Sequence, residues 1–222
     1  VLANPFHPLR KLWTRPELVA RSAIVDAAGA RVFSDDIHAP LTFEGYTHVP
    51  YASVSEVAAA HTITAVSASK AWNLAGLKCA QLVFTNPDDL KLWKKQAFRR
   101  AAEASNPGIV AGTAAYREGL EWLTDALAYL DVNRRLVAGE LPRLVPGAKV
   151  ADLQGTYLQF VDLREAGLPG NPRKFFFEKA AVALTDGDLC GDAGHGFIRM
   201  NIATPTPVLR EILDRMGAAV RP

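Results

Sequence analysis

Three short apolar segments constrain the fold of this chain more than any other feature. They are Val32–Phe33, Thr62–Val66 and Gln81–Phe84, and within each one apolar or β-branched residues dominate without a regular polar alternation. Strands of this length and character are typical of a parallel sheet that is buried on both faces. Stretches with helical spacing alternate with these segments, and helix–strand alternation favours an α/β fold.

The helical stretches carry recognisable start and stop signals. Thr14 and Glu17 form a predicted capping box, and Gly29 ends the first helix. A second helix is predicted over Asp88–Glu103, with Asn86 as its cap. These signals place one helix before the predicted strands in the sequence and one after them.

The last half of the chain has a different pattern. Gly108–Leu144 is helical almost throughout, with a predicted break near Leu123. After it we predict a strand, a helix, a strand and a helix, in that order, over Tyr157–Leu163, Arg173–Leu184, Phe197–Ala203 and Pro207–Met216. We therefore expect a large α/β domain over residues 1–120 and a smaller α+β domain over residues 121–222.

Composition excludes several classes of protein. The 222 residues carry a formal net charge of +2, which is no electrostatic footprint for nucleic acid or an anionic membrane surface. No apolar run approaches the roughly 20 residues that a membrane helix needs. The two cysteines, Cys79 and Cys190, are too few for a disulfide scaffold, so we expect a cytoplasmic protein. The first residues, Val1–Pro5, look like the end of a buried strand, and we expect the sequence to start inside a larger protein.

Polar clusters follow the predicted strands. They are Asn4–Arg10, Asp35–His38 and Ser67–Lys70. In open parallel sheets ligands bind at the carboxyl ends of the strands, so these clusters are expected to converge on one crevice. The sequence therefore predicts a site that combines carboxylate, lysine and hydroxyl groups.

A lysine and a carboxylate in such a crevice suit the chemistry of pyridoxal phosphate (PLP). A partly desolvated lysine amine is nucleophilic and can form a Schiff base. A nearby carboxylate can hold the proton on the pyridine nitrogen of the cofactor. Lys78 and the backbone after Ser67 could bind its phosphate. Each residue alone also fits a solvated loop lysine or a turn carboxylate, and both interpretations stay open at this point.

Four stretches, taken in order, resemble a known family. They are N-P-F-H-P-L-R at 4–10, S-D-D-I-H at 34–38, S-A-S-K-A-W-N-L-A-G-L-K at 67–78 and G-H-G-F-I-R-M-N at 194–201, with Gly155–Tyr157 as a further match. The chain resembles the C-terminal part of a fold-type I PLP enzyme of the class I/II aminotransferase superfamily. Within it, the likeness is to the cystathionine β-lyase type of C–S lyases, which include the maltose-regulon modulator.

The resemblance implies roles around the cofactor ring. Lys70 would hold the cofactor covalently and then act as the base that removes the Cα proton of the substrate. Asp35 would pair with the pyridinium nitrogen. His38 and His7 would lie near the phenolic oxygen, His7 in place of the asparagine that relatives usually have.

It also implies binding groups for the phosphate and the substrate. Ser67, Ser69 and Lys78 would lie near the phosphate, and Arg199 would bind the substrate carboxylate through two parallel hydrogen bonds. Arg10 replaces a glycine of the family's Asn-Pro turn. The histidines His48, His61 and His195 do not have metal-ligand spacing, so no metal is expected.

The activity that the resemblance implies is α,β-elimination of cystathionine or a cysteine S-conjugate to a thiol, pyruvate and ammonia. An aminotransferase of the same fold is the first alternative, because it would use the same lysine, aspartate and arginine. An inactive or regulatory fragment that binds a protein partner is the second, because relatives carry further chain before the Asn-Pro turn. The resemblance also implies an amino-acid substrate and a homodimer.

Overall fold

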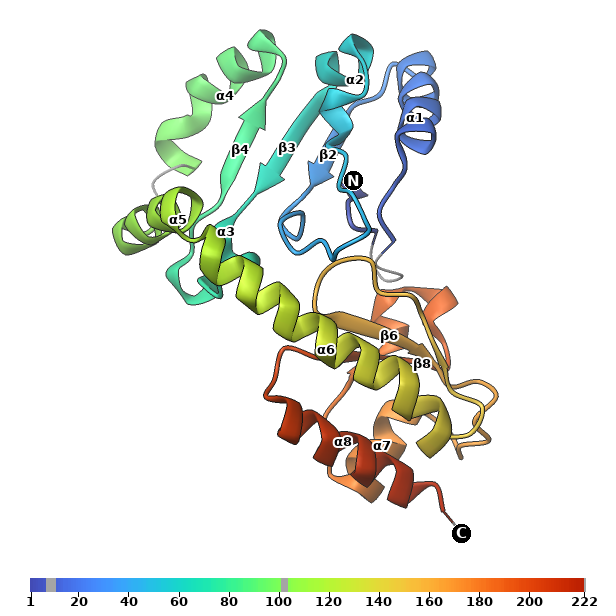
Figure 1. Cartoon of the computed structure of the whole chain (residues 1–222). Helices are drawn as coiled ribbons and strands as arrows, with labels where there is room; N and C mark the ends of the chain where they lie inside the picture. The colour runs from blue at the N-terminus through green and yellow to red at the C-terminus, as the bar shows by residue number, and fades with distance from the viewer. Residues whose placement is uncertain (7–10, 101–103, 222) are drawn as a thin grey trace. The chain divides into compact units, whose positions relative to one another are not determined.

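The chain is described here by a computed structural model that covers residues 1–6, 11–100 and 104–221. It divides into two compact units (Figure 1). The first consists of Val1–Phe6 and Lys11–Ala126, and the second begins at Leu127. The change from one unit to the other falls within a single long helix, α6, Leu120–Leu144.

The first unit is built on a four-stranded mixed sheet. Its strands are β1 Leu2–Ala3, β2 Val32–Asp35, β3 Thr62–Val66 and β4 Gln81–Phe84, hydrogen-bonded in that order. β1, β2 and β3 are parallel, which confirms the predicted parallel core, whereas β4 is antiparallel to β3. The chain stays at the carboxyl end of β3 through two short helical turns, so it enters β4 from that same end.

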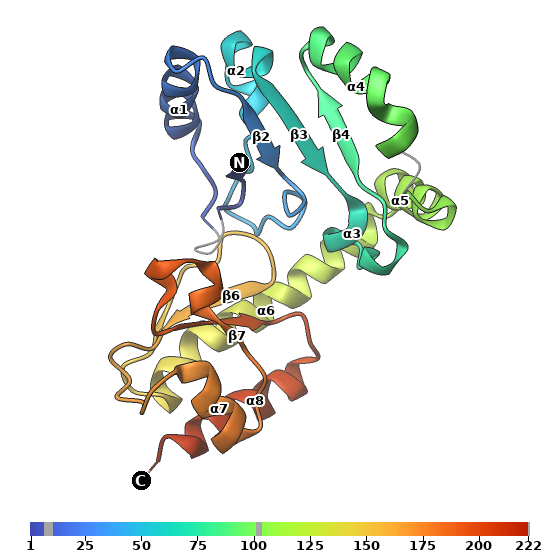
Figure 2. The same cartoon turned by 180° about the vertical axis from the view of Figure 1, so that it is seen from behind.

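Helices lie beside both edges of this sheet. Figures 1 and 2 show α1 on the side of β2 and α4 next to β4. The helical segments of this unit are α1 Arg15–Ala27, η1 Tyr51–Ser53, α2 Glu56–Ala60, α3 Ala68–Ala71, η2 Ala75–Leu77, α4 Pro87–Arg100 and α5 Asn106–Glu118. Leu18, Val32, Tyr51 and Ala58 form a buried core where α1 and α2 cover the sheet.

The capping signals are confirmed. The backbone N–H and the hydroxyl of Thr14 both donate to Oε2 of Glu17, at 2.9 and 2.8 Å. Asn86 Oδ1 accepts the backbone N–H of Asp88, at 2.9 Å, at the start of α4. Both helices therefore begin where local side-chain chemistry predicts.

The predicted break in the long helical stretch is at Gly119 and not near Leu123. The indole N–H of Trp72 donates to the Gly119 carbonyl at 2.8 Å, and a side chain at this position would collide with that indole nitrogen. A contact with a residue 47 positions away thus decides where α5 ends and α6 begins.

The second unit holds a four-stranded antiparallel sheet. Its strands are β5 Lys149–Val150, β6 Leu158–Asp162, β8 Phe197–Asn201 and β7 Thr185–Asp186, in that spatial order. The helical segments beside it are α7 Pro172–Ala180, η4 Gly187–Cys190, η5 Asp192–Gly194 and α8 Thr206–Ala219. Its fully buried side chains include Val137, Leu141, Phe176, Ile198 and Leu209.

The helix predicted to reach Leu184 is shorter than expected. It ends at Ala180, because Ala181 adopts the left-handed conformation with φ of 53°. The N–H of Val182 then bonds to the carbonyl of Phe176 at 3.1 Å, which closes the last turn. The residues that follow enter β7, so pairing with β8 competes successfully with local helical propensity.

Candidate active site

The end of β2 places its polar residues on alternate sides. Ser34 and Asp36 are completely or almost completely buried, whereas Phe33 is 41% exposed and Asp35 is half-buried. Side chains along a strand point alternately to the two faces of the sheet, and the N–H of Asp36 still bonds to β3, at the carbonyl of Ala65. Asp35 therefore lies on the face opposite Asp36.

Asp35 keeps one carboxylate oxygen available. Its Oδ1 accepts the backbone N–H of Ile37 at 3.3 Å, and no described residue bonds to its Oδ2. Such an arrangement fixes the carboxylate within its own turn and leaves an acceptor for another group. This is what a carboxylate that holds a proton on a ligand nitrogen requires.

The serines that follow β3 fasten a loop. Ser67 caps α3 and accepts the N–H of Ser69 at 3.0 Å, while its hydroxyl lies 2.6 Å from both Ser69 Oγ and the carbonyl oxygen of Cys79. One hydroxyl hydrogen is donated to that carbonyl and the other lies between the two serines. The described contacts therefore give Ser67 and Ser69 a structural part in holding the loop at residues 73–80.

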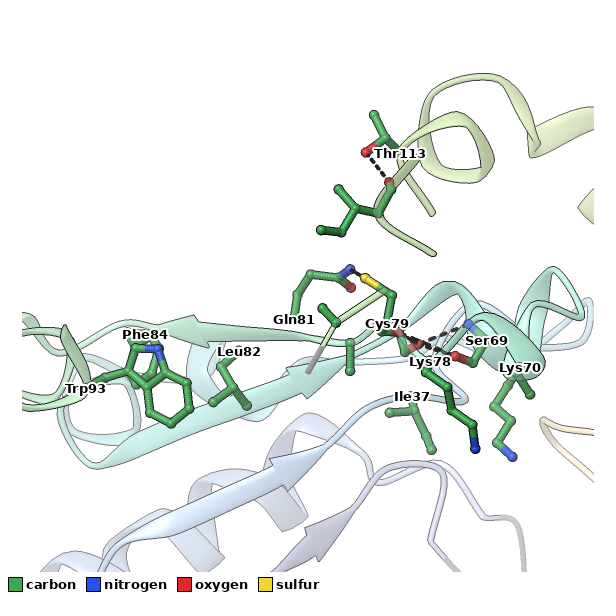
Figure 3. Close-up of a pocket in the computed structure, with 15 residues that line it drawn as sticks. Ile37, Ser69, Lys70, Lys78, Cys79, Gln81, Leu82, Phe84, Trp93 and Thr113 are labelled. Atoms are coloured by element: carbon green, nitrogen blue, oxygen red, sulfur yellow. Dashed lines mark hydrogen bonds between the residues drawn. The ribbon is translucent and has the colours of Figure 1, made fainter. Parts of the chain in front are cut away.

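Two lysines leave this loop on the same side. Lys70 is near the end of α3, and Lys78 follows η2 in the left-handed conformation, with φ of 53°. Figure 3 shows both side chains extending in the same direction beside Ile37. Both lysines line an open pocket of about 990 Å³, together with Ile37, Ser67, Ser69, Leu82 and Phe84.

Strand register brings Asp35 to the face on which this pocket opens. Asp35 stands opposite Ala65 on β3, and Ala65 stands opposite Leu82 on β4. Residues paired in this way share one face of a sheet, so Asp35 lies on the same face as the pocket residues Leu82 and Phe84. A carboxylate and two amines that are far apart in the sequence are thus gathered on one side of the first unit.

Other predicted site residues are placed differently. His38 is half-buried in the turn after β2, and neither it nor Asp35 is among the described residues that line the pocket. Arg199 is half-buried on β8 of the second unit, between Phe160 and Thr185 of the neighbouring strands. His7, like Arg10, lies outside the described residues.

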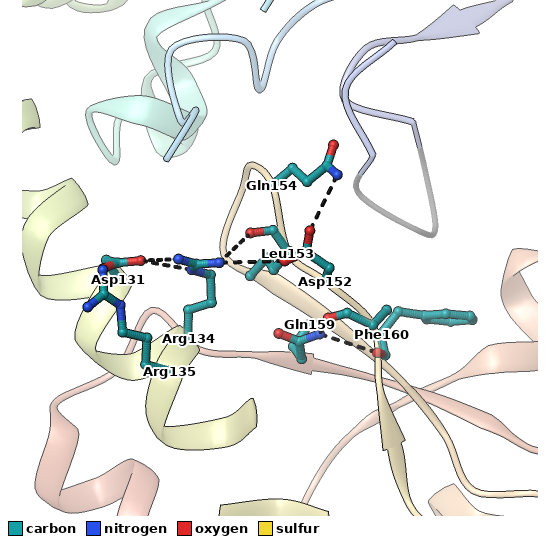
Figure 4. A network of polar contacts seen from close by, with 9 residues as sticks. Asp131, Arg134, Arg135, Asp152, Leu153, Gln154, Gln159 and Phe160 are labelled. Carbon is teal, nitrogen blue, oxygen red and sulfur yellow. Dashed lines mark hydrogen bonds and ion pairs between the residues drawn. The ribbon is translucent and has the colours of Figure 1, made fainter. Parts of the chain in front are cut away.

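The further motif at Gly155–Tyr157 lies in a loop of the second unit that is held by an ion-pair network (Figure 4). Arg134 donates to Oδ1 of Asp131, from Nε at 2.8 Å and from Nη2 at 2.6 Å, and its Nη1 reaches the carbonyl oxygen of Leu153 at 3.4 Å. Thr156 is fully buried in the left-handed region, with φ of 71°. The loop is therefore tied to α6 and not formed by local turn chemistry alone.

Several residues near the site were missed by sequence reasoning. Cys79 lines the pocket, and Gln81 Nε2 donates to its sulfur at 3.5 Å. Burial raises the pKa of the nearby Tyr116 phenol, and Cys79 adds to that rise, so this phenol stays neutral. Asp36 and His48 were also missed. The alternation of side chains along a strand could have revealed Asp36, because it puts Asp36 on the same face as Ser34 and opposite Asp35.

The described residues contain no group of three or more histidine, cysteine, aspartate or glutamate side chains that could hold a metal ion. Within the same part of the chain, none of the helices combines the length and apolar character that crossing a bilayer requires.

Comparison with known proteins identifies the family. Residues 1–216 match the family described as aminotransferase class I and II. The chain belongs to this family. A cystathionine beta-lyase of Corynebacterium glutamicum is 37% identical over 99% of the chain. An aspartate aminotransferase of Geobacillus stearothermophilus is less similar, at 25% identity over 97% of the chain.

A solved structure shows the same fold. It comes from Corynebacterium diphtheriae, is described as a candidate PLP-dependent beta-cystathionase, and superposes on 99% of this chain with a TM-score of 0.93 and 43% identity. The predicted fold class is confirmed. The chain spans 59% of the length of the C. glutamicum lyase and 58% of the C. diphtheriae chain.

Proposed function

We propose that this chain is part of a PLP-dependent carbon–sulfur β-lyase that acts on cystathionine or a cysteine S-conjugate. The observation that carries the proposal is a pocket lined by Lys70 and Lys78, with Asp35 in register with the pocket residue Leu82. The higher identity to a cystathionine beta-lyase than to an aspartate aminotransferase supports the reaction type.

The chemistry of the donor set fits the cofactor. PLP needs an amine for covalent attachment, a cation for its phosphate and an acid partner for its ring nitrogen. Lys70 would supply the amine, Lys78 the positive charge and Asp35 the carboxylate. Ser67 and Ser69 would lie near the phosphate and hold the loop that carries Lys78 in shape, because their hydroxyl hydrogens and the Ser69 N–H are already engaged within the chain.

When bound, PLP supplies an electron sink for the negative charge that develops next to the substrate nitrogen. The Nζ of Lys70 would take the proton from the substrate Cα, and Asp35 would keep a proton on the ring nitrogen. A thiolate on the substrate Cβ can then leave. His38 and His7 would contact the phenolic oxygen, and Arg199 would bind the substrate carboxylate in two parallel hydrogen bonds.

We extend the proposal to the assembly and the compartment. A homodimer is inferred from the family, and a cytoplasmic location is inferred from cysteine usage. Residues 1–120 would belong to the cofactor-binding domain and residues 121–222 to the small domain.

The first experiment is the visible absorption of the purified chain after addition of PLP, followed by borohydride reduction and mass spectrometry. We expect a yellow species that reduction fixes on the peptide that contains Lys70. Lys70→Ala should lose that attachment completely. Lys78→Ala is the matched control, and it should keep the attachment while the dissociation constant for PLP rises about tenfold, the magnitude of one charge-assisted hydrogen bond.

The second experiment separates lyase from aminotransferase. Release of pyruvate and thiol from cystathionine without a keto-acid acceptor supports the lyase, whereas dependence on an acceptor supports the transferase. A folded chain in which wild type and Lys70→Ala both fail to attach PLP would contradict the cofactor assignment for this chain.

A further inference from the structure

A buried carboxylate stands directly behind the proposed cofactor partner Asp35. Asp36 is 2% exposed, and its Oδ1 accepts the hydroxyl of Ser34 at 2.7 Å. Its Oδ2 lies 3.5 Å from Nε2 of His48, which is an ion-pair distance. That nitrogen is buried and makes no hydrogen bond with a described residue. Ser34, Asp36 and His48 thus form a compact polar cluster beneath the end of β2, which we call the inner cluster.

The inner cluster has to compensate a buried charge. A carboxylate removed from water is costly unless it is paired and hydrogen-bonded. Ser34 supplies one hydrogen bond, and Nε2 of His48 faces the other carboxylate oxygen at ion-pair distance. We therefore take His48 to be the group that favours the inward position of Asp36.

The direction of Asp36 decides the direction of Asp35. The two carboxylates are adjacent in the sequence, and neighbouring side chains on extended backbone point to opposite faces. With Asp36 turned toward Ser34 and His48, Asp35 faces the side on which Lys70 and Lys78 line the pocket. A turn that released Asp36 to solvent would carry Asp35 away from that face.

The segment that carries His48 is fastened independently. Asn4, which is fully buried, donates from Nδ2 to the carbonyl oxygen of Val49 at 2.9 Å and from its backbone N–H to the carbonyl oxygen of Asp35 at 3.2 Å. Asn4 thus contacts both segments, through its side chain next to His48 and through its backbone N–H at Asp35. These bonds fix the backbone beside His48 relative to the end of β2.

We propose that His48 is a positioning residue: through the buried carboxylate of Asp36, it holds Asp35 on the face of the sheet where the cofactor ring nitrogen would be bound. This role of His48 rests on the proposed function, because the proposed function is what assigns Asp35 to the ring nitrogen of the cofactor. The contacts of the inner cluster are all made by residues of this chain.

The test uses His48→Gln, Asp36→Asn and the double variant, with His195→Gln as the matched control. His195 also faces an aspartate, Asp188, but its side chain is 86% exposed. The first readout is the thermal midpoint of each cofactor-free variant. We expect each single change in the inner cluster to lower the midpoint and the double variant to recover a large part of the loss, because an amide pair leaves no charge buried. His195→Gln should leave the midpoint unchanged.

The second readout is PLP binding below the unfolding temperature. His48→Gln should raise the PLP dissociation constant at least tenfold and shift the visible band in the same sense as Asp35→Asn. At saturating PLP, borohydride should still fix the cofactor on Lys70. The double variant should recover the wild-type band, which a loss of stability alone does not predict.

The third readout needs no cofactor. In a Cys79→Ser, Cys190→Ser background, the thiol of Asp35→Cys should react readily with a maleimide. Adding His48→Gln should slow that reaction at least threefold, and adding His195→Gln should not.

The outcomes are distinguishable. Additive losses of thermal stability, an unchanged PLP band in His48→Gln, or an unchanged labelling rate at position 35 would each overturn the positioning role. Absence of any PLP band in the wild-type chain would contradict the proposed function. In that case the stability cycle and the labelling rate still decide whether His48 sets the direction of residue 35.

Discussion

Two carboxylate–imidazole pairs in the described part of the chain differ mainly in burial. Asp36 and His48 lie 3.5 Å apart with side chains 3% and 13% exposed, whereas Asp188 and His195 lie 3.3 Å apart with side chains 48% and 86% exposed. The exposed pair has the shorter distance, yet water and salt screen it, and such pairs contribute little to stability. The distance between two charged groups therefore says little about how much their pairing contributes to stability. The comparison indicates that exposure to solvent decides that contribution.

Breaking the buried pair should have the largest effect. His48→Ala leaves Asp36 without its ion-pair partner, and we expect a loss of about 3 kcal/mol in the free energy of unfolding. Urea unfolding monitored by circular dichroism measures it, with an unchanged m-value as a check on the native state. His195→Ala is the control, with no measurable loss expected. Similar losses for the two alanine variants would mean that burial does not separate the pairs.

A third histidine, His61, sharpens the comparison, because it is buried against a tyrosine hydroxyl and not against a carboxylate. Nε2 of His61 lies 2.9 Å from the hydroxyl of Tyr51, and burial lowers the pKa of this imidazole, although Asp26 partly opposes the shift. The unfolded state then binds a proton more readily than the folded state. Stability should fall as the pH drops below about 6.5, by at most about 1.4 kcal/mol per pH unit.

His61→Gln removes this titration. Unfolding free energies measured between pH 8 and pH 5 should depend less on pH in His61→Gln than in the wild type. His195→Gln is the control and should follow the wild type, since the His195 side chain is 86% exposed. An unchanged slope in His61→Gln would contradict the assignment of the pH dependence to this buried ring.

The smallest effect is expected for an ion pair at the surface of the second unit. Nε and Nη2 of Arg164 donate to the two carboxylate oxygens of Asp162 at 2.9 and 2.6 Å, and this pairing lowers the pKa of Asp162. A lowered folded-state pKa stabilises the protein above about pH 4, and the benefit is lost as the pH falls through the folded-state value. Because Arg164 is 60% exposed, solvent screening reduces the benefit further.

Asp162→Asn should lower the thermal midpoint by about 2 °C or less at neutral pH. The difference from wild type should shrink in 0.5 M salt and near pH 3, as measured by scanning calorimetry. A midpoint loss as large as that of His48→Ala would show that two good hydrogen bonds outweigh exposure in this chain.

The sequence by itself determined the elements whose signals are local. The capping box at Thr14 and Glu17, the cap at Asn86 and the short apolar strands depend on neighbouring residues, and all are present in the structure. The ordered motifs likewise indicated the family, because they do not depend on how distant parts of the chain meet. The roles of Lys70, Asp35 and the other site residues stay predictions until PLP binding is measured.

Only the tertiary structure decided the features that depend on distant partners. The antiparallel direction of β4, the end of α5 at Gly119 and the end of α7 at Ala180 each follow from a strand or a side chain elsewhere in the chain. The same holds for the inner cluster, where His48 meets a carboxylate twelve positions earlier that sequence reasoning had passed over in favour of its neighbour Asp35. Local propensities are additive along the chain, whereas burial and the pairing of charges exist only after the chain has folded.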